Sequence, residues 1–397
     1  MKIFARQKGR TRFMNQKDLA EIKRRLNPDK RNPTAICGCY VDHVGNPITS
    51  FTLNVNTLPE RENEKYMALF KKVLSGQIGQ NLMPIGFEPD NVHYAAMLQS
   101  RDSALADEEA LQSLFSSLIA GIRAEHPDTQ SVEDAQKADN WLILLLHDNM
   151  DVRRRNHNDE IDLENSDGAF SYLLCAVCPV KQDKAALRYD PMDSLFHERG
   201  SEWQAGAPAM GFLFPLYEGG AADVNTVLFF SRDQNDAHRE FLEAAFQLEA
   251  VMPAAEQTDN FQNVLAQTLG ADCSLEVIQE MHSTVSEMIA GQGREDEPLM
   301  LSKGDVSRML SESGVPEEKV EAFETGYDQV FGAGAVLPAV NVVAPRQFKV
   351  ELPSVSIKVD PEQADLLETR VIEGRSYLLI PIDGDISVNG QPVFAKK

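Results

Sequence analysis

Cysteine is scarce in this sequence, and long apolar runs and a secretory signal are missing. Five cysteines in 397 residues are an odd and sparse set, which is typical of reduced thiols in a reducing compartment. No apolar run approaches the roughly 20 residues that a membrane-spanning helix requires. The N-terminus is basic, but it has neither the apolar segment nor the small-residue cleavage site of a secretory signal. These absences predict a cytoplasmic protein without a membrane partner.

The charge is distributed unevenly between the N-terminus and the remainder of the chain. Residues 1–31 hold eleven Lys and Arg against three acidic residues, a net charge of +8; the whole chain carries −23, which leaves −31 for the remainder. A body this acidic repels phosphate backbones. We therefore expect no nucleic-acid partner, except through a basic arm at residues 1–31. Because chain termini are often unfolded, residues 1–13 are predicted to be a basic extension ahead of the folded part.

The spacing of apolar residues predicts an α+β fold, a mixed sheet with packed helices followed by two smaller parts. Residues 14–250 alternate between helical stripes, a hairpin and four apolar strands, the pattern of a mixed-sheet α/β domain. Residues 258–335 carry apolar stripes at helical spacing and are predicted to be entirely helical up to residue 331. Residues 340–397 contain short strand patterns with tight turns such as Asn389-Gly390. We therefore predict a helical segment at 258–335 and a small β domain at 340–397.

The strand predicted at Trp141–Leu146 ends in a dense polar cluster. Its unbroken apolar run is typical of a strand buried on both faces. In open α/β sheets, ligands bind in the crevice at the carboxyl ends of such strands. His147, Asp148 and Asp151 are therefore candidates for a base, an orienting carboxylate or metal ligands. In such a crevice we expect His147 to be partly exposed.

Three further residues are candidates for ligand binding. Arg153 and Arg154 follow the polar cluster, and guanidinium groups hold anionic ligands well. Trp203 precedes another apolar strand and is a candidate for the wall of a pocket, although an isolated aromatic is more often part of the core. Strands also end in Asp and Asn for purely structural reasons. The sequence contains no nucleophile elbow and no HExxH motif, so we favour the structural interpretation of the cluster.

Two cysteine pairs offer an alternative, a four-thiolate zinc site. The pairs are Cys37 with Cys39 and Cys175 with Cys178, and four thiolates are a common ligand set for structural zinc. Side chains alternate along a strand, so Cys175 and Cys178 are predicted to point to opposite faces. Both pairs also lie within apolar runs rather than on tight turns. We therefore favour buried thiols that pack as small apolar groups, and we expect neither a metal nor a cofactor.

Six segments resemble one uncharacterised bacterial family, the domain of unknown function 4317. They are MNQKDLAEIKRRL (14–26), CGCYVD (37–42), LILLLHDNMDV (142–152), YLLCAVCPV (172–180), GFLFP (211–215) and IKVDPEQADLLETRVIEGRSYLLIP (357–381). The resemblance begins at Met14 and covers nearly the whole chain. It implies no activity, substrate or catalytic residue.

The function that these features favour is non-catalytic. Several parts of different architecture without a catalytic signature are more typical of an interaction protein than of an enzyme, on an associational argument. We therefore expect a protein that binds another macromolecule or a small molecule. The alternative is a hydrolase-like enzyme with its site in the loop 147–155. A third hypothesis is association with RNA or the ribosome through the basic N-terminal arm.

Overall fold

The computed structural model describes residues 14–30, 33, 35–87, 91–126, 139–152, 168–218, 221–293, 296–382, 386–388 and 390–393. The chain forms two compact units. The first runs to Glu256 and includes Gly293–Pro298, and the second consists of Gln257–Gln292 and the chain from Leu299 onward. Apart from residues 293–298, the predicted helical segment and the predicted β segment thus fall within one unit. Their division into two domains stays a prediction, whereas the α+β class is confirmed.

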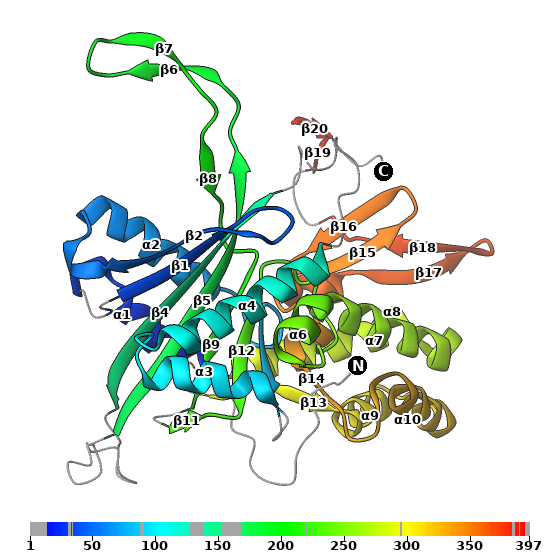
Figure 1. The fold of residues 1–397 in the computed structure, drawn as a ribbon. Helices are drawn as coiled ribbons and strands as arrows, with labels where there is room; N and C mark the ends of the chain where they lie inside the picture. Colours follow the sequence, from blue (N-terminus) through cyan, green and yellow to red (C-terminus); the bar gives the residue numbers. More distant parts are fainter. Residues whose placement is uncertain are drawn as a thin grey trace. The chain divides into compact units, whose positions relative to one another are not determined.

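An antiparallel sheet of eight strands forms the centre of the first unit (Figure 1). Its order is β2-β1-β4-β5-β9-β12-β3, and β8 pairs with the end of β5. The strands are β1 (Ala35–Val41), β2 (Pro47–Asn54), β3 (Leu82–Gly86), β4 (Asn140–Val152), β5 (Gly168–Gln182), β8 (Trp203–Ala205), β9 (Met210–Phe214) and β12 (Thr226–Ser231). The two longest, β4 and β5, contain the apolar runs from which buried strands are predicted. Because their apolar residues have no polar alternation, both faces of the sheet must be covered.

Helices cover both faces of this sheet. One face carries α1 (Gln16–Arg25) and α2 (Glu60–Val73), and the other carries α3 (Val92–Asp102), α4 (Glu108–Glu125) and α6 (Arg239–Phe246). The even-numbered residues Leu144 and Leu146 pack with α1 and α2, whereas Ile143 and Leu145 pack with α4 and α6. This alternation is the period of two expected of a strand. The helix α4 begins where the sequence predicts, because Asp107 caps the amide groups of Glu109 and Ala110.

The central strand β4 is longer than its apolar run. The prediction that it ends at Leu146 is wrong, because it continues to Val152, and His147 to Asp151 pair with Leu173 to Ala169 of β5. The sheet is also antiparallel in every pairing. The polar cluster was inferred to be a site because ligands bind in the crevice at the carboxyl ends of parallel strands. The described strands of this sheet are all antiparallel, so this reason for a site does not apply.

Two hairpins extend the first unit beyond the sheet. The longer one consists of β6 (Ala186–Asp190) and β7 (Leu195–Arg199), and it continues outward from β5 and β8 (Figure 1). The shorter one consists of β10 (Leu216–Glu218) and β11 (Ala221–Asp223). The sequence pattern does not predict the longer hairpin, because charged residues interrupt its apolar residues.

The described part of the second unit combines amphipathic helices with three hairpins and one further pair of strands. The helices are α7 (Ala254–Leu269), α8 (Leu275–Ala290), α9 (Lys303–Glu312), α10 (Glu317–Phe331) and α11 (Ala339–Val342). The hairpins pair β15 (Phe348–Leu352) with β16 (Val355–Val359), β17 (Glu368–Ile372) with β18 (Arg375–Leu379), and β19 (Ile386–Val388) with β20 (Gln391–Val393). The further pair joins β13 (Met300–Ser302) to β14 (Val336–Pro338), with α9 and α10 between them in the chain. Short 3-10 helices lie at Pro28–Lys30, Val55–Thr57, Gly270–Asp272 and Pro361–Leu366.

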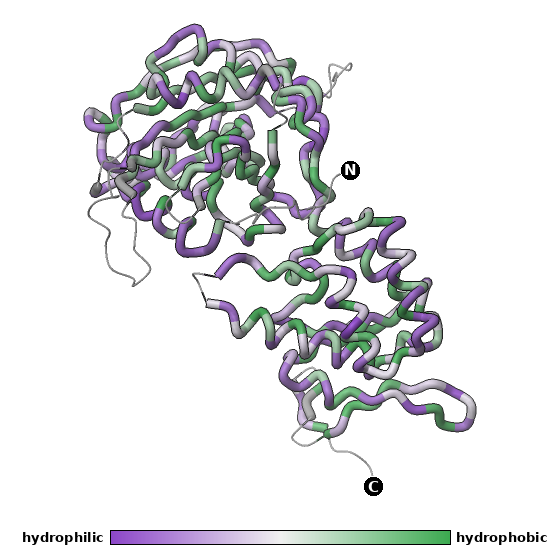
Figure 2. The backbone as a smooth tube through the Cα atoms, turned by 90° about the horizontal axis from the view of Figure 1, so that it is seen from below, coloured by the Kyte–Doolittle hydropathy of each residue, from purple (hydrophilic) through white to green (hydrophobic). Residues whose placement is uncertain are grey.

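Hydropathy alternates along the helices of each unit, as the change between green and purple in Figure 2 shows. Such alternation is expected of helices with one apolar face toward a core. The prediction that residues 258–331 are entirely helical is wrong at β13, which pairs with β14. Among the helices that the structure describes, none combines the length and the apolar character needed to cross a membrane.

Candidate functional site

His147 lies inside β4, on the sheet face that carries α3 and α4. Its exposed fraction is 7%, and its Nε2 atom lies 2.9 Å from the hydroxyl of Ser171 on β5. Burial lowers the pKa of His147 below its ordinary value, an effect only partly opposed by the charge of Asp148. The expectation of a partly exposed ring is therefore wrong. The ring is a neutral, bonded group of the interior.

Asp148 points to the opposite face and is bonded by both carboxylate oxygens. Arg25 of α1 donates from Nε to Oδ2 at 2.5 Å and from Nη2 to Oδ1 at 2.9 Å, and the hydroxyl of Tyr172 donates to Oδ2 at 2.9 Å. The amide of Asn149 donates to Oδ1 at 2.9 Å. Burial, followed by the charge of Asp148, raises the pKa of Tyr172 well above its ordinary range, so the phenol keeps its proton. Four donors fill the acceptor capacity of this carboxylate.

The other residues predicted around this cluster do not join His147 and Asp148 in one place. Successive residues of β4 face opposite sides of the sheet, so the two side chains are separated by the strand itself. The backbone of Asp151 pairs with Ala169, but its side chain lies outside the described residues, as do Arg153 and Arg154. Trp203 begins β8 opposite Gln182 and is half exposed.

The four strand cysteines divide between the two faces of the sheet. Cys37, Cys39 and Cys175 lie in the core under α4 and α6, whereas Cys178 lies in the core under α1 and α2. Burial raises the pKa of all four thiols, that of Cys178 to about 12. Because the sheet separates Cys178 from the other three, four thiolates do not converge on one point. The geometry matches the alternation that the sequence predicts.

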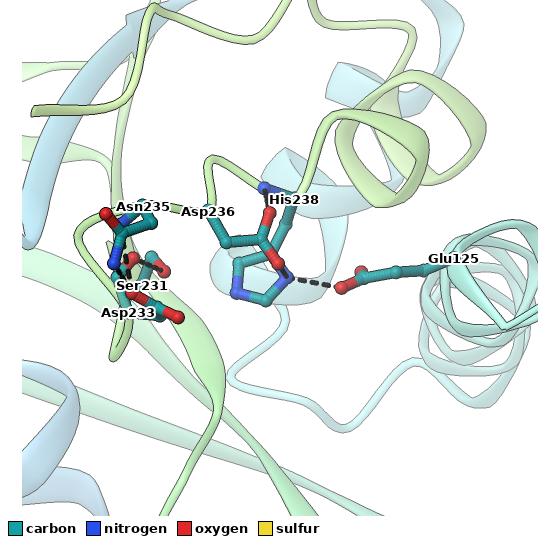
Figure 3. Close-up of polar contacts among 6 residues, drawn as sticks. All are labelled: Glu125, Ser231, Asp233, Asn235, Asp236 and His238. Carbon is teal, nitrogen blue, oxygen red and sulfur yellow. Dashed lines mark hydrogen bonds and ion pairs between the residues drawn. The ribbon is translucent and has the colours of Figure 1, made fainter. Parts of the chain in front are cut away.

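A different cluster, formed by Glu125, Asp236 and His238, is the strongest candidate site in the described part of the chain (Figure 3). Glu125 is the last residue of α4, Asp236 lies in the loop after β12, and His238 is the N-cap residue of α6. The Nδ1 atom of His238 lies 2.5 Å from Oε1 of Glu125 and 3.6 Å from Oδ2 of Asp236. One ring nitrogen and two carboxylates thus face a common point.

Close packing of α4 against α6 positions this cluster. A Cβ atom on Gly121 would lie 2.6 Å from the ring of Phe241, so only glycine allows the two helices to approach this closely at that point. The approach brings Glu125, one turn further along α4, to the start of α6. The ring of His238 also meets Phe229 of β12 at 6.0 Å in an edge-to-face arrangement, which holds it against the sheet.

Hydrogen bonds within the loop 231–238 hold Asp236, the third residue of the cluster, in place. The hydroxyl of Ser231 donates to the carbonyl of Asp233 at 2.7 Å, and the amide of Asn235 donates to the Asp233 carboxylate at 2.9 Å. Asp236 accepts from the amide of His238 at 2.8 Å through Oδ1, which leaves Oδ2 toward the ring (Figure 3). His238 has a φ of 50° and a left-handed backbone, a conformation rare for a residue with a side chain.

Two buried atoms of the cluster have no hydrogen-bond partner among the described residues. They are Oε2 of Glu125 and Nε2 of His238. Burial lowers the pKa of His238, but the hydrogen bond and charge of Glu125, with the charges of Asp236 and Asp233, together raise it above its ordinary value. Native proteins leave few such buried atoms unbonded. The cluster therefore has a capacity for bonding that the fold does not use.

Sequence reasoning did not identify this cluster, because Glu125 and His238 are 113 positions apart. Glu125 looks like an ordinary polar end of an amphipathic helix, and the segment around Asp236 looks like a turn. The one local signal is the run of Asp233, Asp236 and His238 directly before an apolar helix, which is also the pattern of a helix start. Only the packing of α4 on α6 brings the acid to the imidazole.

The family model of the domain of unknown function DUF4317 matches residues 14–391. Since the match covers nearly the whole chain, the protein belongs to this family, and the resemblance expected from the sequence is confirmed. No curated protein matches the chain.

Proposed function

We propose that this DUF4317 protein is a non-catalytic binding protein that holds a protein partner through the hairpin formed by β6 and β7. The observation that carries the proposal is the concentration of exposed apolar side chains on and beside this hairpin. Leu187, Tyr189, Met192, Leu195, Phe196 and Trp203 each expose 50–94% of their surface. A concentration of exposed apolar side chains is typical of an interaction site.

Leu187, Tyr189 and Phe196 lie on one face of this two-stranded ribbon, whereas Leu195 pairs with Asp190 on the other face. Tyr189 pairs directly with Phe196, with ring centroids 5.5 Å apart, and Leu187 follows Tyr189 on the same side. A two-stranded ribbon that packs against nothing gains little stability of its own. A partner surface that covers this face would supply the burial that the hairpin lacks.

The charges of the hairpin lie mainly on the other side and are paired there. Arg188 forms an ion pair with Asp183, Arg199 lies 3.6 Å from Asp190, and His197 lies 2.5 Å from Asp193. The face of Leu187, Tyr189 and Phe196 is therefore free of cations, which favours an apolar contact over an anionic ligand.

The partner that fits best is a protein with an apolar patch and a basic surround. The chain carries a net charge of −23, which attracts basic partners and repels a second copy of itself. Arg25, which belongs to the basic arm of the RNA hypothesis, is bonded to Asp148 in the interior. The hydrolase hypothesis gains no support either, because His147 and Asp148 lie on opposite faces of a covered sheet.

Site-specific photo-crosslinking in the native host tests this proposal. A photoreactive amino acid at Tyr189 should yield a discrete adduct with another protein, and the same amino acid at Arg188, on the opposite face, should not. The adduct should disappear when Leu187→Ser and Phe196→Ser are combined with the crosslinker. Equal adducts from both faces would contradict the proposal. An adduct of twice the mass of the chain would identify a second copy as the occupant and would also contradict it.

A further inference from the structure

We propose that Glu125, Asp236 and His238 form a binding site for a first-row divalent transition-metal ion, with zinc as its simplest probe. This inference does not depend on the hairpin, and it concerns a different part of the first unit. It rests on three observations: the convergence of the donor atoms, the burial of the imidazole, and the buried Oε2 atom of Glu125, which has no hydrogen-bond partner among the described residues.

The donor atoms lie close enough together to share one ion. Their ligand atoms all lie within 4.8 Å of one another. Zinc binds imidazole nitrogen and carboxylate oxygen at about 2.0–2.2 Å, so two of its ligands lie about 3–4 Å apart. The distance of 3.6 Å between Nδ1 of His238 and Oδ2 of Asp236 already falls in this range.

One distance must change when an ion enters. Nδ1 of His238 and Oε1 of Glu125 are 2.5 Å apart because they share a hydrogen bond, and an ion between them requires a separation about 0.5–1 Å longer. Glu125 is the last residue of α4, and a side chain with three rotatable bonds accommodates such a change. Its Oε2 atom, which has no hydrogen-bond partner among the described residues, provides a second oxygen for the same ion.

The burial of the imidazole distinguishes this cluster from an ordinary group of surface acids. The side chain of His238 exposes 8% and that of Glu125 exposes 12%. The Nδ1 edge of the ring faces the two carboxylates, and Nε2 on the opposite edge has no hydrogen-bond partner among the described residues. Asp236, in contrast, is half exposed, so an ion reaches the cluster from the side of Asp236.

The ligand types determine the class of ion. Imidazole nitrogen with two carboxylates suits zinc, manganese, iron(II) and cobalt(II), whereas magnesium prefers oxygen ligands alone and retains its water. Two carboxylates also balance the charge of a divalent ion in a partly buried position. Three protein ligands leave at least one coordination position for water or a further ligand.

Isothermal titration calorimetry with zinc chloride tests the site on the full chain, after treatment with a chelator. The parent protein should bind one ion per chain at these residues. Glu125→Gln and Asp236→Asn should each lower the affinity at least about tenfold. Glu240→Gln, an exposed acid two positions after His238 on α6, should leave the affinity unchanged, and magnesium chloride should produce no binding.

Cobalt(II) absorption spectra provide a second measurement, because an ion pair with only a structural role would give no visible bands with cobalt(II). Visible bands should appear with the parent and with Glu240→Gln, and they should be lost with Asp236→Asn, whose half-exposed side chain makes misfolding of the variant a small concern. Zinc affinity that is equal in the parent and in both ligand variants would overturn the proposal. Cys273 is the one cysteine that is not fully buried. Binding that survives Asp236→Asn but is lost in Cys273→Ser would assign the ion to this thiol and would overturn the proposal as well.

Discussion

Two buried ionic clusters of the first unit differ in how completely their polar atoms are bonded. Asp148 receives donors on both carboxylate oxygens, from Arg25, Tyr172 and the amide of Asn149. Glu125 and His238 bond each other, but one buried atom of each has no partner within the part of the chain that the structure describes. A fully bonded carboxylate has no capacity for a ligand, whereas an incompletely bonded group retains one. Unused bonding capacity is therefore a better guide to a site in this protein than density of charge in the sequence.

The largest effect on stability is expected from a substitution that disrupts the fully bonded cluster. Asp148→Ala should lower the free energy of unfolding by about 3 kcal/mol, because it leaves the guanidinium of Arg25 and the hydroxyl of Tyr172 without their acceptor. Denaturant unfolding with Glu240→Gln as the control measures this loss. A decrease below about 1 kcal/mol would show that the network around Asp148 contributes little to stability, and the contrast between the two clusters would not hold.

The pH dependence of stability should separate the two buried histidines. The pKa of His147 is lowered in the folded state, so its contribution is present above its unfolded pKa of about 6.5 and is lost as the pH falls through the folded pKa. The pKa of His238 is raised, so its contribution is present below about 6.5 and is lost as the pH rises through the folded pKa. Each slope is at most about 1.4 kcal/mol per pH unit.

Chemical denaturation in the presence of EDTA, from about pH 5 to about pH 9, measures these slopes across the range in which histidine titrates. At acidic pH, His147→Gln should lose less stability than the parent protein does. At alkaline pH, His238→Gln should lose less stability than the parent protein does. Parallel profiles for the two variants would contradict the opposite directions of the two shifts.

A smaller effect is expected at the incompletely bonded cluster. Glu125→Gln should cost about 1 kcal/mol of unfolding free energy in the absence of metal, because it exchanges a charged hydrogen bond for a neutral one. The same measurement on Asp148→Asn provides the comparison, and that variant should lose more. If Glu125→Gln were the more destabilising of the two, the cluster at α6 would be the structural one.

The smallest effect on stability is expected at the hairpin. Leu187→Ser with Phe196→Ser should change the free energy of unfolding by under about 0.5 kcal/mol, because both side chains are exposed. Thermal and denaturant unfolding of the double variant measure this change. A larger loss would show that the apolar face packs within the protein itself, and a partner would no longer be needed to cover it.

Several features of the fold follow from the sequence alone. The buried strands within β4 and β5 follow from apolar runs without polar alternation, and the start of α4 follows from the capping residue Asp107. The separation of Cys175 from Cys178 follows from the period of a strand. These are local properties, since propensity, capping and periodicity act within a few residues.

The character of the polar residues was decided only by the tertiary structure. His147 and Asp148 look like the end of a strand, but partners from distant segments allow them to lie within it: Arg25, which bonds Asp148, is 123 positions away. Glu125 and His238 look like ordinary helix ends until α4 and α6 pack together at Gly121. A buried polar group is stable only when its partner is in place, and that partner comes from the fold rather than from neighbours in the sequence.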